Sequence, residues 1–251
     1  MTSRADVERY SRVVSTVAEA AVAEVHRIFR GLDLSDHRGA RDVLVEAIPR
    51  LTAAYGDVSA TSAAQWYETV RDRAVGGRYE ALLADLEDYV ARAAGDVRYA
   101  AGRLFTGEIE QAQTLISSSV DKHVKNAGRS TIALNIAADS KGPRWARVPR
   151  GPVTCAWCLM LASRGWVYHT QATAGSVGHE YHAHCDCQIV PEWGKVKAHI
   201  AGYDPKALYG KYSQARAEVV AQGLTPDAET IAAQIRRLFP NSVTDGVLTR
   251  P

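Results

Sequence analysis

Apolar residues recur every three or four positions over most of the first half of the chain. The first stripe begins near the N-terminus and contains Val7, Tyr10, Val14, Val17, Ala21, Val25 and Ile28. This spacing places the apolar side chains on one face of a helix. Gly31 follows the stripe and is a typical residue at a helix C-terminus, so we expect the first helix to end there.

The pattern continues through further predicted helices. A helix is expected over residues 41–55, with Pro49 as a kink or break inside it and a turn at Gly56 and Asp57. A third helix is expected from residue 59 to the Gly76-Gly77 pair, with Trp66 and Tyr67 in the core.

Residues 78–98 and 99–126 carry the same helical spacing of Leu, Ile, Val and Tyr. We therefore expect the first half to be a helical bundle or a long helical array. There is no internal repeat and no sustained heptad pattern, which argues against a solenoid or a long coiled coil.

The pattern changes at Asp139, where the segment DSKGPRWARVPRGP begins. Its prolines and glycines cannot continue a helix and indicate a linker or a strand-forming arm. Three regions are predicted: a helical region at 1–138, a Cys/His module with the preceding arm at 139–194, and a helical extension at 195–251. Overall the chain is predicted to be mainly α, with an N-terminal helical bundle, a small zinc-stabilised α+β module and C-terminal helices.

The C-terminal extension contains two helical patterns, at 205–221 and 226–239. For the second helix, Thr225 is the expected N-cap and Pro226 the first helical residue. The polar tail from Pro240 is expected to be loose.

Charge and hydropathy exclude several classes of protein. The 251 residues include 30 Lys and Arg against 28 Asp and Glu, so a net charge of +2 gives no global basis for binding nucleic acid. No apolar run is long enough to span a membrane, and the charged N-terminus is unlike a signal peptide. Arg144, Arg147 and Arg150 recur every third residue, and in an extended arm they would contact a phosphate backbone or an acidic protein surface, or simply face solvent.

The most specific chemical feature is the set of cysteines. All four lie between Cys155 and Cys187, as Cys155-x-x-Cys158 and then His182-x-x-Cys185-x-Cys187. Two such pairs suit the tetrahedral shell of structural Zn²⁺, whereas Cys-poor sequence elsewhere argues against a disulfide framework. The candidate metal ligands are Cys155, Cys158, His182, Cys185 and Cys187, while His169, His179 and His184 are further histidines nearby.

Ligand type favours a structural metal site over a catalytic one. A closed shell of four protein ligands does no chemistry, and thiolates reduce the Lewis acidity that a hydrolase needs. We therefore expect no enzyme activity and no small-molecule substrate. A metal-dependent nuclease or other hydrolase acting on DNA is the main alternative, because HEYHAHC could supply a histidine general base. A Cys155–Cys158 redox pair and a DNA-binding zinc finger are weaker alternatives.

Three segments, in this order, resemble a known family. They are WYETVR with Arg71, RWARVPRGPVTCAWCLMLASRGWVY, and YHAHCDCQIVPEW. Together they closely resemble the minor head proteins of tailed bacteriophages, the Mu F-like head-morphogenesis family in the form seen in phages of actinobacteria. The resemblance covers roughly residues 59–193. In that family a helical region precedes a small domain with Cys-x-x-Cys and a terminal His-x-x-Cys-x-Cys. Here His184 is extra to the pattern, so the choice of histidine stays open.

The resemblance implies a minor capsid protein of the virion. Such a protein would be made in the cytoplasm of the bacterial host and located in the head interior or at the portal vertex. Its expected partners are the phage portal protein, the major capsid protein, or packaged DNA. Its expected role is in head assembly and in DNA packaging or delivery, by binding and not by catalysis.

Overall fold

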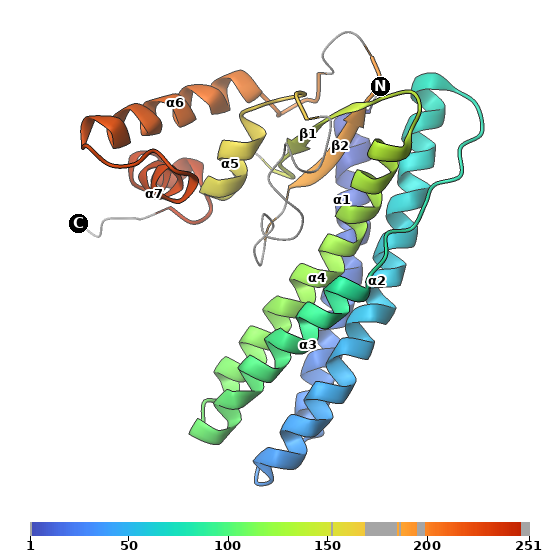
Figure 1. Ribbon diagram of the computed structural model, residues 1–251, viewed down its shortest axis with the longest axis vertical. Helices are drawn as coiled ribbons and strands as arrows, with labels where there is room; N and C mark the ends of the chain where they lie inside the picture. Colours follow the sequence, from blue (N-terminus) through green and yellow to red (C-terminus); the bar gives the residue numbers. More distant parts are fainter. Residues whose placement is uncertain (1, 152, 169–184, 186, 195–198, 247–251) are drawn as a thin grey trace.

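The computed structural model describes residues 2–151, 153–168, 185, 187–194 and 199–246. Four long helices form a bundle along the longest axis of the molecule (Figure 1). They are α1 (Arg4–Arg30), α2 (His37–Val75), α3 (Glu87–Ala101) and α4 (Ile109–Ala138), with a 3₁₀ turn (Gly102–Thr106) between the last two. Helix α4 packs against each of the other three. The mainly α fold predicted from the apolar pattern is confirmed.

The remaining elements lie at one end of the bundle (Figure 1). Strands β1 (Arg144–Val148) and β2 (Gln188–Glu192) form an antiparallel pair, with Ala146 opposite Val190. Helix α5 (Ala156–Ala162) follows β1.

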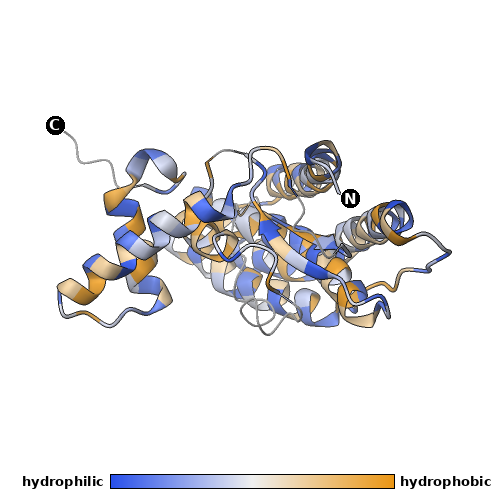
Figure 2. Cartoon of the chain, turned by 90° about the horizontal axis from the view of Figure 1, so that it is seen from above, coloured by the Kyte–Doolittle hydropathy of each residue, from blue (hydrophilic) through white to orange (hydrophobic). Residues whose placement is uncertain are grey.

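The C-terminal extension forms a pair of packed helices. They are α6 (Pro205–Ala221) and α7 (Ala228–Leu238), followed by a short 3₁₀ turn (Pro240–Ser242). Seen from above, this pair extends to one side of the bundle (Figure 2). It contacts α5, and so its apolar face packs against the cysteine-bearing helix.

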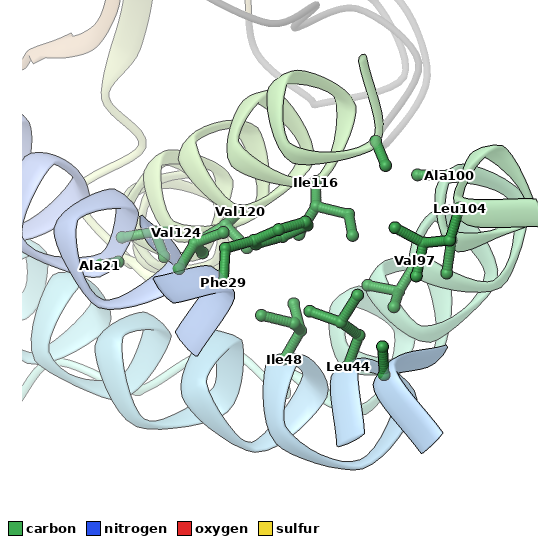
Figure 3. Close-up of a cluster of buried hydrophobic side chains, with 14 of the residues drawn as sticks. Ala21, Phe29, Leu44, Ile48, Val97, Ala100, Leu104, Ile116, Val120 and Val124 are labelled. Carbon is green, nitrogen blue, oxygen red and sulfur yellow. The ribbon is translucent and has the colours of Figure 1, made fainter. Parts of the chain in front are cut away.

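The bundle core follows from the apolar stripes. Phe29 of α1, Leu44 and Ile48 of α2, Val97 of α3 and Ile116 of α4 meet in one buried cluster (Figure 3). Each of these side chains is at most 5% exposed. Burying a large aliphatic or aromatic side chain contributes about 1.5 to 3 kcal/mol, so this cluster stabilises the half of the bundle distant from the strands.

Helix α1 confirms its predicted stripe and its end at Gly31. The predicted break in the second helix is wrong, because α2 runs without interruption through Pro49, Gly56 and Asp57. Its buried residues recur at helical spacing across both positions, and an unbroken helix keeps all of them in the core. Gly56 also permits a close approach, since a Cβ there would lie 3.1 Å from Leu86 Cδ1.

The helix predicted over 78–98 is wrong in its first half, because helix α3 begins only at Glu87. Side chains of the bundle satisfy the backbone of the preceding segment. The Asn135 side chain accepts from Leu82 N and donates to Leu82 O, both at 2.8 Å, and Thr131 Oγ1 accepts from Ala84 N. These bonds replace helical ones. The predicted continuation from Tyr99 is likewise interrupted by the 3₁₀ turn.

Two details near the C-terminus differ from expectation. Asp227, not Thr225, is the N-cap of α7, since its carboxylate accepts a hydrogen bond from Thr230 N at 2.8 Å. The segment after Pro240 contacts the rest of the chain, because Asp245 accepts hydrogen bonds from Ala156 N and Arg236 Nε. The strand-forming alternative for the arm after Asp139 is confirmed by β1. The division at 138/139 and 194/195 stays a prediction.

Candidate metal centre

The cysteines converge from two segments that are far apart in the sequence. Cys155 is the N-cap of α5 and Cys158 lies in its first turn, while Cys185 and Cys187 directly precede β2. All four are buried and none forms a disulfide. The sulfur of Cys158 lies 3.0 Å from that of Cys185 and 3.1 Å from that of Cys187. The sulfurs of Cys185 and Cys187 are 3.3 Å apart.

The turn at Cys155 has the form expected of a Cys-x-x-Cys knuckle. The backbone N–H of Cys158 donates a hydrogen bond to Cys155 Sγ at 3.3 Å. A donor of this kind favours a thiolate and orients the sulfur. Cys155 is thereby held beside Cys158, in the same buried cluster as Cys185 and Cys187.

The geometry fits one tetrahedral ion. A Zn–S bond is about 2.3 Å, which places tetrahedral sulfurs about 3.8 Å apart. The observed separations of 3.0 to 3.3 Å need only a small outward shift. They are too long for a disulfide, whose sulfurs lie about 2.05 Å apart. Cys158, Cys185 and Cys187 all lie within metal-binding reach of one another. Thiolate ligands favour zinc, Cu(I) or iron–sulfur clusters over Mg²⁺ and Ca²⁺.

The local electrostatics favour one thiolate even before a metal binds. Hydrogen bonds from Cys158 and then Cys187 lower the pKa of Cys185, with a further contribution from the positive charge of Arg129. Hydrogen bonding to Cys155 and Cys185, together with burial, raises the pKa of Cys158. Because closely spaced sulfurs cannot all ionise without a countercharge, a divalent cation would stabilise the fully deprotonated set.

Arg129 of α4 connects this cluster to the bundle. Its side chain is 2% exposed. Nη2 donates to Cys185 O at 2.7 Å, Nε donates to Cys187 O at 3.2 Å, and Nη1 donates to Asn126 Oδ1 at 3.0 Å. The planar guanidinium therefore holds two carbonyls of the ligand-bearing segment at fixed positions. The sequence showed no sign of this residue, because it lies within a helical stripe far from the cysteines.

The cysteines also belong to an aromatic and aliphatic cluster shared with the bundle. Tyr10 of α1, Tyr67 of α2, Ile132 of α4 and Trp145 of β1 pack with them. The prediction for Tyr67 is confirmed, since it is fully buried, while Trp66 is only partly buried and stacks on Tyr10. The cysteine cluster therefore shares its surroundings with three of the long helices.

A second buried network surrounds Asp139. Arg71 donates to both carboxylate oxygens, with Nε 2.9 Å from Oδ2. Tyr67 Oη and Trp193 Nε1 donate to the same Oδ2 at 3.1 and 2.9 Å. These bonds join the end of α2, the end of α4 and the chain after β2. They position the strand pair at the end of the bundle, which is where the cysteines lie.

The predicted contact surface of three arginines is wrong. Arg147 is 1% exposed, whereas Arg144 and Arg150 are exposed. Alternate residues of a strand point to opposite faces, so residues three apart cannot share one face of β1. Arg150 donates instead to Ser15 Oγ at 3.2 Å, on α1. The arginines therefore do not form a continuous basic surface.

The histidines of the predicted site lie outside the described residues. These are His169, His179, His182 and His184. Among the described residues, Cys158, Cys185 and Cys187 lie within metal-binding reach of one another, and Cys155 is buried in the same cluster. Their role as metal ligands, like that of His182, stays a prediction.

The chain is thus a helical-bundle protein with a buried cysteine cluster at one end of the bundle. A model of the VG15 protein family matches residues 1–215, so the chain belongs to this family.

Two similar proteins come from mycobacteriophages. The gene 15 protein of Mycobacterium phage D29 is 30% identical over 167 residues, which cover 52% of this chain and 60% of that protein. The gene 15 protein of Mycobacterium phage L5 is 28% identical over 141 residues, which cover 40% of this chain and 48% of that protein. The matched part is thus less than two thirds of either relative. No solved structure matches.

No helix in the described part of the chain combines the length and apolar character needed to cross a membrane.

Proposed function

We propose that this chain is a minor capsid protein of a tailed bacteriophage, which acts in head morphogenesis by binding and positioning other components. The observation that carries the proposal is the buried cysteine cluster joined to a long helical bundle. Such a centre would stabilise a surface for binding, and its four cysteines are buried. The VG15 family membership and the similarity to mycobacteriophage gene 15 proteins support a phage protein.

The finer assignment depends on sequence resemblance to Mu F-like minor head proteins. On this assignment the protein would lie in the head interior or at the portal vertex, in contact with the portal protein, the major capsid protein or packaged DNA. The near balance of charge favours a protein partner over DNA as the main contact.

The metal in this proposal is a structural Zn²⁺. Cys155, Cys158, Cys185 and Cys187 would hold it, with His182 as the alternative to one of these thiolates. The ion would supply folding energy by joining the turn at Cys155 to the chain before β2. The residues around it would exclude water and fix the two ligand-bearing turns.

The location is tested with purified virions of a phage that encodes this chain. Mass spectrometry is expected to detect the protein in particles, and a density map of the portal vertex is expected to show it on the head side. Its absence from complete virions would refute a capsid component.

The nature of the metal is tested separately. Metal analysis is expected to find one zinc per chain. Cys158→Ser and Cys185→Ser should each lose the zinc and melt at a lower temperature than the native chain. DNA cleavage that disappears in His182→Ala, while zinc and the fold persist, would establish the nuclease alternative instead.

A further inference from the structure

A groove of about 800 Å³ lies between the packed helices α1 and α4. Both helices run the length of the bundle (Figure 1). Three carboxylates line the groove: Glu19 from α1, and Glu110 and Asp121 from α4. None of the described residues that line it is Lys or Arg. The groove is therefore acidic on balance, with Glu19 and Glu110 exposed and Asp121 paired with Lys125, in a chain whose overall charge is slightly positive.

Two polar atoms in the wall of the groove are buried and unsatisfied. Asp121 is 9% exposed, and Lys125 Nζ contacts its Oδ1 at 2.6 Å. Asp121 Oδ2 and Ser117 Oγ have no hydrogen-bond partner among the described residues. Leaving a buried donor or acceptor unpaired is destabilising, and more so for a charged group. These two unpaired atoms indicate that a bound ligand supplies the missing hydrogen-bond partner.

The shape of the groove suits a helix. Its α1 side is formed by residues 19–26 and its α4 side by residues 110–121, with lining positions three or four apart on each helix. Ala23, Thr114 and Ser117 have small side chains, which leave the groove open to a bound helix. Small side chains at such positions let a third helix approach two packed helices closely.

We propose that the α1–α4 groove binds a basic amphipathic helix of a partner protein. Lys or Arg side chains of this helix would pair with Glu19 and Glu110, and one would donate to Asp121 Oδ2. Charge complementarity selects this occupant, because an acidic groove repels nucleic acid and favours a cationic helix. The inference rests on the binding role proposed above and names the kind of partner, but it does not depend on the metal centre.

The test uses the full chain and a synthetic helical probe. The probe is a fluorescein-labelled peptide of about 15 Ala, Leu and Lys residues, with lysines three or four positions apart on one face. Its matched control has Glu in place of each Lys. Fluorescence anisotropy at low salt is expected to show binding of the Lys peptide alone, weakening as salt rises. Amide chemical-shift changes are expected to map to α1 and α4.

The protein variant is Glu19→Lys with Glu110→Lys, at two exposed positions where the fold should tolerate the change. It is expected to weaken binding of the Lys peptide at least about tenfold. The control variant, Glu46→Lys with Glu218→Lys, makes the same change of charge at exposed positions outside the groove, and it should alter the affinity less than about twofold.

Equal affinity in the two variants, or no binding of the Lys peptide by the native chain, would overturn the proposal. A dimer that sedimentation detects and that Glu19→Lys with Glu110→Lys dissociates would assign the groove to a second copy of this chain, and would also overturn it. A failure here with zinc bound and the protein present in virions would leave the proposed function intact.

Discussion

Arg129 should be the residue on which the link between the cysteine cluster and the bundle depends. In Arg129→Met, Cys185 O and Cys187 O lose their donor in a buried setting. Leaving each carbonyl unsatisfied costs about 1 to 3 kcal/mol, so we expect a loss of about 2 to 5 kcal/mol in the free energy of unfolding. Because these carbonyls orient two ligand-bearing residues, zinc affinity should also fall by about 10- to 100-fold.

The assay follows urea unfolding by circular dichroism, with zinc-loaded protein and with chelated protein, under conditions that keep thiols reduced. Zinc affinity is measured in parallel by competition with a chromophoric chelator. Arg129→Lys keeps the charge but loses the planar set of donors, and we expect it to fall between the native protein and Arg129→Met.

Arg98→Met is the matched control, since Arg98 is an exposed arginine of α3. Its stability should change by no more than about 0.5 kcal/mol and its zinc affinity should not change. If Arg129→Met behaves like Arg98→Met in both measurements, Arg129 does not link the cysteine cluster to the bundle.

Three further predictions use other parts of the structure. Burial alone would raise the pKa of Asp6, but hydrogen bonds from Arg73 and Ser3 outweigh it and lower the pKa to about 2. Asp6 therefore stabilises the fold above about pH 4 and loses this effect as the pH falls towards 2. In urea titrations at pH 7, Asp6→Asn should lower the free energy of unfolding by about 1 to 2 kcal/mol. It should also weaken the fall in stability between about pH 4 and pH 2, and an unchanged fall there would contradict this. Gly128→Ala should lower the melting temperature, because the added Cβ would lie 2.8 Å from both Tyr10 Oη and Ser59 Oγ. Gly95→Ala meets no atom within 4 Å and should raise stability by about 0.5 to 1 kcal/mol, so equal shifts in calorimetry would refute the packing argument. Chelation should lower the melting temperature of the native chain but not that of Cys158→Ser, and equal effects would argue against a structural metal.

The helices were predictable where apolar spacing was regular and uninterrupted. The stripe beginning at Val7 predicted α1 and its end, and α6 was predicted at its observed bounds. The helix-breaking residues Pro49 and Gly56 led to a wrong prediction of where the second helix ends. The core contacts of α2 on both sides of these residues outweigh the local cost of each residue to the helix. The extended segment before α3 could not be predicted, since its hydrogen bonds come from side chains such as Asn135 and Thr131.

The cysteines of the candidate site were predictable because their spacing is a local property of the chain. Their convergence into one buried cluster agrees with that prediction. The groups that support them were not predictable. Arg129 and the Arg71–Asp139 pair act across large sequence separations, and no local pattern distinguishes them from surface charges.

The sequence by itself determined the mainly helical character, the cysteine spacing and the family resemblance, because each depends on neighbours along the chain. Tertiary structure alone decided the burial of Arg147 and Arg129, the unbroken path of α2, and the acidic groove between α1 and α4. These features depend on which helix faces meet. Burial and pairing energies between distant residues set that arrangement, and no single segment contains them.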